Sequence, residues 1–126
     1  MSAGRDEPRR EPDPTALVDR HVVEVGERQA WPFLTFAHPE DEPELRLYID
    51  AEITVEPSPR LPADLAPDLE QLVTLSGFNC ATVASVEVDQ NDALILVFDD
   101  LSGSRLTVSG KPTATTVGLP WWLGRC

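Results

Sequence analysis

Residues 82–109 carry the clearest pattern of apolar and polar positions in the chain. From Val83 to Val88 the side chains alternate in character with a period of two, as in a half-buried strand. Residues 93–98 form a short, nearly unbroken apolar run, which is typical of a central strand buried on both faces. Residues 105–109 alternate again, and polar turn sequences separate the three runs. The pattern predicts a three-stranded antiparallel meander.

A second meander is predicted earlier in the chain. Residues 22–25 have strand-like character, and the aromatic run at 31–36 is β-prone, with its proline tolerated only near a strand start or an edge. Residues 45–49 alternate cleanly in a third strand, which the pattern extends through Ile53 and Val55.

The two meanders resemble each other element by element. Each consists of a strand, a hairpin, a strand that ends in Phe, an acidic turn and a third strand. Two explanations are open, namely internal duplication and the likeness that any two meanders share. The matched segments are, in order, Leu17-Val18 with Leu75, VVEV with VASVEV, WPFLTF with ALILVF, and LRLYI with SRLTV.

A proline-rich connector at residues 57–62 separates the meanders and blocks both helix and ladder pairing. A short helix is expected after it, with Asp64 or Asp68 as its cap, Pro67 in its first turn and Gly77 at its stop. Its apolar positions recur at spacings of three and four, which predicts a stripe that packs on the sheet or, alternatively, a groove for a partner. These positions are Leu65, Leu69, Leu72 and Val73.

Near the C-terminus, residues 113–117 are expected to add a short edge strand. Trp121 and Trp122 are adjacent, so on an extended chain they point to opposite sides, one toward the core and the other toward solvent. These elements together predict a mainly antiparallel α+β fold. Residues 1–14 are expected to form a disordered tail, and residues 15–126 a single β-rich domain.

The net charge of -12 is unevenly distributed along the chain. Residues 40–100 hold two arginines against fifteen acids, whereas residues 101–126 hold three basic groups and no acid. Such a field repels nucleic acid and anionic membrane and steers a basic partner toward the acids. The simpler interpretation is that the acids keep a small β protein soluble and unassociated. The N-terminus lacks the apolar core of a secretion signal, so a cytoplasmic location is expected.

The sequence offers little catalytic chemistry. His21 and His38 are the only histidines, and no G-x-S-x-G elbow or phosphate-binding loop occurs. The acids of residues 89–92 begin the pattern of a calcium loop and then depart from it, so a hairpin turn explains them. Cys80 and Cys126 match no metal-ligand spacing and are expected to be free thiols. We therefore expect no catalytic residue, no metal and no cofactor.

The segment VEVDQNDALILVFDDLSGSRLTV, followed by a terminal Trp segment, resembles small uncharacterised actinobacterial β-domain proteins with an F-D-D-G-x-x-L-x-V hairpin. In this chain the glycine of that hairpin is displaced, because Ser102-Gly103-Ser104 is inserted there. The resemblance covers residues 75–122 and is weaker over 17–55. These families are similar in size to immunity proteins, which neutralise toxins, and the resemblance implies no catalytic residue.

These observations predict a non-catalytic protein-binding module, in its sharpest form an acidic immunity-type inhibitor of a basic toxin or nuclease. Two alternatives are a small hydrolase or lyase that uses His38 with nearby acids, and a carrier that holds an apolar ligand between sheet and helix. The residues expected to face the partner are Glu40, Asp41, Glu42, Glu44, Asp99, Asp100, Trp121 and Trp122.

Overall fold

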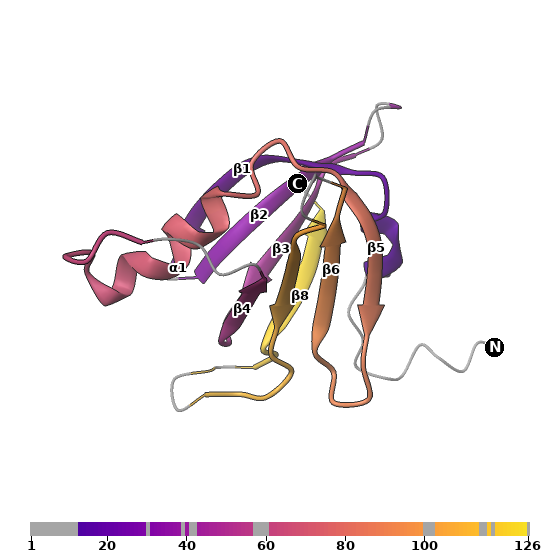
Figure 1. Cartoon of the computed structure of the whole chain (residues 1–126). Helices are drawn as coiled ribbons and strands as arrows, with labels where there is room; N and C mark the ends of the chain where they lie inside the picture. Colours follow the sequence, from indigo (N-terminus) through magenta and orange to yellow (C-terminus); the bar gives the residue numbers. More distant parts are fainter. Residues whose placement is uncertain are drawn as a thin grey trace.

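The computed structural model describes residues 13–29, 31–38, 40, 43–56, 61–99, 103–113, 116 and 118–125. These residues form two four-stranded antiparallel sheets, one α-helix and one short 3-10 helix (Figure 1), which confirms the mainly antiparallel α+β prediction. Sheet A has the order β1 (His21–Arg28), β2 (Trp31–Ala37), β3 (Leu45–Ile49) and β8 (Trp121–Arg125). Sheet B has the order β4 (Ile53–Glu56), β7 (Arg105–Val108), β6 (Leu94–Phe98) and β5 (Val83–Val88).

Both predicted meanders are present, as β1-β2-β3 in sheet A and β5-β6-β7 in sheet B. The prediction that the third strand runs on through Ile53 and Val55 is wrong. β3 ends at Ile49, and the chain turns over residues 50–52 before β4 pairs with β7 in the other sheet. The alternation continues across the turn because β4 is also half-buried, so the pattern alone does not reveal the change of sheet.

The hydrophobic core lies between the two sheets, where alternate side chains of every inner strand meet. On β6, Leu94, Leu96 and Phe98 are buried, whereas Ile95 and Val97 are only half-buried. The prediction that this strand is buried on both faces is therefore wrong, because no element among the described residues covers the outer face of sheet B. The largest fully buried side chains include Trp121, Phe36, Phe98, Leu17, Leu34, Leu47, Ile49 and Leu75.

Two helical segments complete the core. The 3-10 helix η2 (Pro14–Leu17) lies against β5, and α1 (Pro67–Ser76) lies against β1 and β2 (Figure 1). The described structure begins at Asp13, which caps η2, two residues before the expected domain start at residue 15. The remainder of the expected tail, residues 1–12, lies outside the described residues.

The helix begins with Pro67 as predicted, but its N-cap is Ala66, without a side-chain hydrogen bond, and not an aspartate. The predicted apolar stripe is only partly correct. Leu69 and Val73 are exposed, and the side chains that reach the core are Leu75 and, just beyond the helix, Phe78. The helix therefore contacts the sheets mainly through its C-terminal end.

The two halves of the chain are related by an approximate two-fold axis that passes near the bridge between His21 and Thr82. On either side of that bridge, Val22 N donates to Ala81 O at 2.9 Å and Val83 N donates to Arg20 O at 2.8 Å. Adding 61 to the number of the first-half residue and subtracting 61 from that of the second-half residue converts each of these hydrogen bonds into the other.

The same relation extends outward from the bridge. Asp19 N donates to Val83 O at 2.9 Å, and Cys80 N donates to Val22 O at 2.8 Å. Asp19 and Cys80 both adopt positive φ angles, 72° and 74°. A bulge follows Val22 in β1 and follows Val83 in β5. A shared left-handed residue and a shared bulge go beyond the likeness of any two meanders and favour internal duplication.

The fourth strand of each half is exchanged. β4 leaves the first meander and pairs with β7, and β8 leaves the second meander and pairs with β3. Equivalent hydrogen bonds begin the two exchanges, from Asp50 N to Pro120 O at 2.7 Å and from Ser109 N to Glu52 O at 2.9 Å. The segment matching proposed from the sequence holds in register for WPFLTF with ALILVF and for LRLYI with SRLTV. VVEV and VASVEV are equivalent strands, but they differ in length, so their match defined no register. Its first match is wrong, because Phe78, not Leu75, occupies the position equivalent to Leu17.

Candidate protein-binding surfaces

The acidic connections of the two meanders lie at the same end of the sandwich. Ala37, the last residue of β2, pairs with His21, and Asp99, which follows β6, donates its backbone N–H to Thr82 O at 2.7 Å. Because His21 bridges Thr82, the four positions form one line across the two-fold axis. The connections that start after Ala37 and at Asp99 therefore leave the sheets at the same end, separated by the positions of His21 and Thr82.

Three of the predicted partner-facing acids, Glu40, Glu44 and Asp99, lie on these two connections and are exposed. We call these three residues the acidic end. Asp41, Glu42 and Asp100 belong to the same connections in sequence but lie outside the described residues. The structure thus places acids that are about 60 positions apart in the chain at the same end of the sandwich, which the sequence pattern alone did not predict.

Buried side chains and backbone contacts hold this end in place. Arg20 is 4% exposed and donates from Nε to Ala16 O at 2.8 Å and from Nη1 to Pro43 O at 2.9 Å. Pro43 immediately precedes Glu44, so the buried guanidinium fixes the backbone next to an exposed acid. In the other connection, Phe98 N donates to Ser104 O at 2.8 Å.

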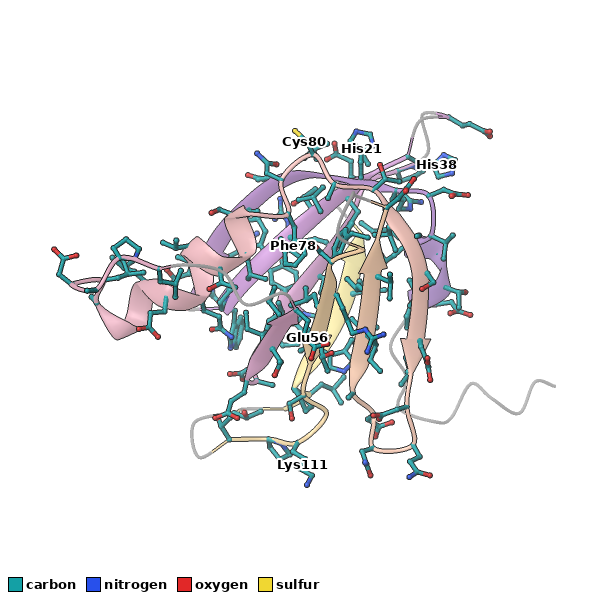
Figure 2. The ribbon with its side chains drawn as sticks, viewed as in Figure 1. His21, His38, Glu56, Phe78, Cys80 and Lys111 are labelled. Carbon is teal, nitrogen blue, oxygen red and sulfur yellow. The ribbon has the colours of Figure 1, made fainter. Side chains whose placement is uncertain are left out.

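His38 has a structural contact in this region, and Figure 2 shows it at the same end of the molecule as His21 and Cys80. Its Nδ1 accepts a hydrogen bond from the backbone N–H of Glu40 at 3.0 Å, so the imidazole shapes the turn that presents Glu40. Across the described residues, no group of three or more His, Cys, Asp or Glu side chains is placed to hold a metal ion. Cys80 is exposed and carries a free thiol.

A second candidate surface covers the outer face of sheet A. One row across the sheet contains Gly26, Phe33, Tyr48 and Trp122, which pair in that order from β1 to β8. Trp31 lies next to the row on β2. We call Trp31, Phe33, Tyr48 and Trp122 the aromatic face.

The rings of the aromatic face contact one another in sequence. Phe33 meets Tyr48 edge-on at a centroid distance of 5.8 Å, Tyr48 stacks on Trp122 at 5.3 Å, and Trp122 meets Trp31 nearly perpendicularly at 5.1 Å. Phe33 is 7% exposed although it lies outside the core cluster, because its neighbours on the outer face cover it. Trp31, Tyr48 and Trp122 are half-buried.

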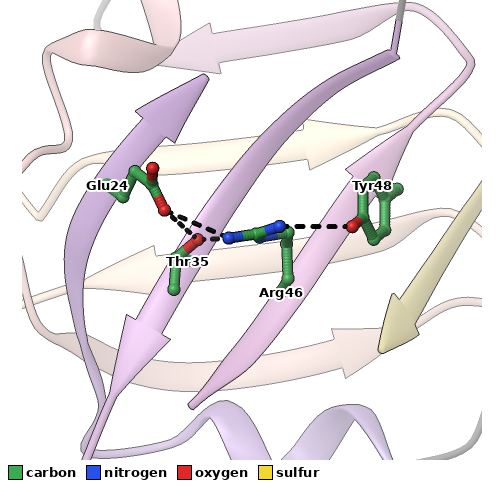
Figure 3. A network of polar contacts seen from close by, with 4 residues as sticks. All are labelled: Glu24, Thr35, Arg46 and Tyr48. Atoms are coloured by element: carbon green, nitrogen blue, oxygen red, sulfur yellow. Dashed lines mark hydrogen bonds and ion pairs between the residues drawn. The ribbon is translucent and has the colours of Figure 1, made fainter. Parts of the chain in front are cut away.

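The neighbouring row is polar and is centred on Arg46 (Figure 3). The guanidinium lies 4.2 Å from the Phe33 ring centroid and donates to Thr35 Oγ1 at 3.1 Å and to Glu24 Oε1 at 3.2 Å. Thr35 Oγ1 in turn donates to Glu24 at 3.1 Å, and Arg46 Nη1 reaches Tyr48 Oη at 3.4 Å. This network ties β1, β2 and β3 together and limits the rotamers of the adjoining rings.

The two tryptophans that were expected to face a partner, Trp121 and Trp122, have different roles. Trp121 is 0% exposed, and its Nε1 donates to Asp92 O at 2.8 Å, so it joins β8 to the β5-β6 turn of the other sheet. The expectation that Trp121 faces a partner is therefore not met, because it is a core residue. Trp122 points to the outer face, as adjacent residues of a strand must. The predicted edge strand at 113–117 is also wrong where it is described, since Thr113 and Thr116 form a turn, and the pairing strand is β8.

Sequence reasoning missed the contribution of Trp31, Phe33, Tyr48 and Arg46. A signal was present, because Trp31 and Phe33 share one parity in β2 and Arg46 and Tyr48 share the outward parity in β3. What the sequence lacked was the register that aligns the two strands and adds β8.

Among the described residues, no helix has the length and apolar character needed to span a bilayer. No protein-family model, no curated protein and no solved structure matches this chain.

Proposed function

We propose that this protein is a non-catalytic protein-binding module whose acidic end docks on a basic site of another protein. The observation that carries the proposal is the position of Glu40, Glu44 and Asp99, from separate halves of the chain, at the same end of the sandwich. In its sharpest form the partner is a basic toxin or nuclease that the acidic end blocks.

Electrostatics supplies the physical reason. A chain with a net charge of -12 steers a basic partner toward itself, and anchored acids present that charge without a large cost of ordering. Arg20, which lies between η2 and β1, is buried and donates to the carbonyl oxygens of Ala16 and Pro43, so it helps to hold the backbone beside Glu44 in place. Charges of this kind act mainly on the rate of association and on specificity.

The test is a charge-neutralising triple variant, Glu40→Gln, Glu44→Gln and Asp99→Asn. The partner is first captured from lysate of the native host on the immobilised wild-type chain, and its binding is then measured by surface plasmon resonance at several salt concentrations. We expect the association rate to fall about tenfold or more in the variant, and to fall with salt in the wild type, since exposed charges are screened beyond about 8 Å at physiological ionic strength.

A matched control carries the same change in net charge at exposed acids elsewhere, namely Asp64→Asn, Glu70→Gln and Glu87→Gln. The control should retain most of the wild-type association rate. If both triple variants slow association equally, only the overall charge matters and the acidic end is not the docking site.

A further inference from the structure

We propose that the aromatic face of sheet A is the contact surface between two copies of this chain, which pair face to face about a two-fold axis. The proposal concerns a different surface from the acidic end and does not depend on it. Three observations support it: the identity of the residues at equivalent positions of sheet B, the charge of each face, and the small residues at the sheet edges.

The internal two-fold provides a built-in comparison. The row that contains Gly26, Phe33, Tyr48 and Trp122 in sheet A corresponds to a row of Glu87, Ile95, Thr107 and Thr54 in sheet B, by the same strand pairings. Sheet B forms without any aromatic ring in this row. The fold itself therefore does not require the aromatic side chains, and Trp and Tyr are the residues most enriched at the centres of protein interfaces.

The charge of each face indicates which partner fits. The outer face of sheet A carries Arg28, Arg46 and Glu24, whereas that of sheet B carries Glu56, Glu87 and Arg105. Sheet A thus presents both signs with a small positive excess on a chain of net charge -12. Glu24 is paired with Arg46 of its own chain but its side chain is still 53% exposed, so two copies that meet through sheet A can bring it against the exposed Arg28 of the second copy. Contact through two acidic surfaces would instead bring like charges together.

The shape of the face also suits a second sheet. Gly26 and Gly124 lie on the two edge strands, β1 and β8. A Cβ atom at Gly26 would lie 2.7 Å from Phe33 Cζ, so that glycine is needed by the ring of its own chain. Among the described residues a Cβ at Gly124 would meet only Tyr48 Cε2, at 3.8 Å, so these residues leave room there for a side chain. The equivalent position in sheet B holds Glu56.

Because Gly124 has no side chain, the β8 edge next to the Trp122 ring leaves space for another sheet to approach at the usual spacing of about 10 Å. A symmetric pairing of the same face on both copies closes after two subunits, as in the most frequent class of homo-oligomer. Head-to-tail contact of sheet A with sheet B would instead continue without closing.

The test is light scattering after size exclusion, with sedimentation velocity, on the full chain from about 1 to 500 μM, the range that covers weak to moderate dimers. We expect the wild type to form a dimer. Two variants should be monomeric over the same range: the double variant Tyr48→Thr with Trp122→Thr, which installs the residues of sheet B, and Gly124→Glu, which keeps every ring and adds the side chain that sheet B has.

The matched control is Thr54→Ala with Thr107→Ala on sheet B, which should remain dimeric. Circular dichroism of each variant verifies the fold, and Gly124→Glu keeps the test decisive if the double variant unfolds. A wild type that stays monomeric at the highest concentration overturns the proposal, as does an open-ended polymer or a dimer that persists in the folded Gly124→Glu variant. The acidic-end triple variant should dimerise like the wild type, so either proposal can fail without the other.

Discussion

The outer faces of the two sheets differ although their backbones are related by the internal two-fold. In sheet A one row carries rings on β2, β3 and β8 with Gly26 on β1, whereas the equivalent row of sheet B carries Ile95, Thr107, Thr54 and Glu87. Gly124, next to that row on β8, corresponds to Glu56 on β4. One scaffold therefore tolerates two opposite distributions of volume and charge. The difference shows that the fold does not require a particular residue at these outward-facing positions.

The inward faces are alike where the outward faces differ. Leu34 and Leu96 are equivalent and fully buried, and so are Phe36 and Phe98. Even the arginine of the polar row, Arg46 in sheet A and Arg105 in sheet B, occurs in both halves. The core constrains residue volume through close packing, whereas outward positions are free to acquire a binding role.

The largest effects are expected inside, where the two halves should respond alike. Phe36→Ala and Phe98→Ala should each lower the free energy of unfolding by about 3 to 5 kcal/mol, because each removes a fully buried ring. Phe98 also stacks on Phe78 at 4.4 Å, so its loss should be at the upper end. Urea denaturation measures both. A neutral result at either position would contradict the equivalence of the two cores.

A smaller effect is expected where the core itself departs from two-fold symmetry. Trp121 and Ile53 occupy equivalent positions on the exchanged strands, but only Trp121 is fully buried and hydrogen-bonded to the opposite sheet. Trp121→Phe should cost about 2 kcal/mol, since it removes volume and leaves Asp92 O without the indole donor. Ile53→Val, the control, should cost about 1 kcal/mol or less. Equal losses would mean that the Trp121 hydrogen bond adds nothing.

Local patterns in the sequence were sufficient for the meander strands and for the register of the second and third strands of each repeat. Alternation reports which side of a strand is buried, and WPFLTF and ALILVF are matched residue by residue in the structure. The exchange of β4 and β8 was not predictable in this way. Ile53 and Val55 continue the parity of β3, and only the distant partner β7 places them in the other sheet.

For the candidate surfaces too, local sequence features identified individual residues, whereas tertiary pairing determined how those residues are arranged. The acids were identified from charge alone, but their meeting at one end depends on the bridge between His21 and Thr82. Trp121 and Trp122 were noticed as a pair, and strand geometry correctly separates them, but no local rule says which one is buried. The aromatic face required the alignment of β2, β3 and β8, which is set by tertiary pairing.

The polar rows provide the next comparison. Arg46 has a side chain that is 21% exposed, lies over Phe33 and hydrogen-bonds across two strands, whereas Arg105 is 55% exposed and reaches Glu56 only at 3.9 Å. Arg46→Ala should lower the free energy of unfolding by about 1 to 2 kcal/mol through lost packing and hydrogen bonds. Arg105→Ala should cost less than about 0.5 kcal/mol, as exposed ion pairs do. Thermal denaturation of the two variants measures both losses. A larger loss for Arg105→Ala than for Arg46→Ala would contradict the contrast between the two polar rows.

The smallest effects are expected at the starts of the two helical segments. Asp13 caps η2 by accepting from Thr15 N and Thr15 Oγ1, both at 2.9 Å, whereas Ala66 caps α1 with no side-chain bond. Ala66→Asp should stabilise the protein by about 0.5 to 1 kcal/mol, as a new N-cap does. Asp13→Ala should destabilise it by less, because η2 is a single short turn whose cap is exposed to solvent.

The pH dependence of Asp13→Ala distinguishes loss of a charged cap from loss of packing. The backbone hydrogen bond from Thr15, aided by its hydroxyl, lowers the pKa of Asp13 below its usual range. A lowered pKa in the folded state means that the stabilisation is fully present above the unfolded pKa and is lost as the pH falls through the folded one. The difference in stability between wild type and Asp13→Ala should therefore be constant above about pH 5 and shrink toward pH 2. Urea titrations at several pH values measure it, and a difference that stays unchanged down to pH 2 would mean that the carboxylate charge has no part in capping η2.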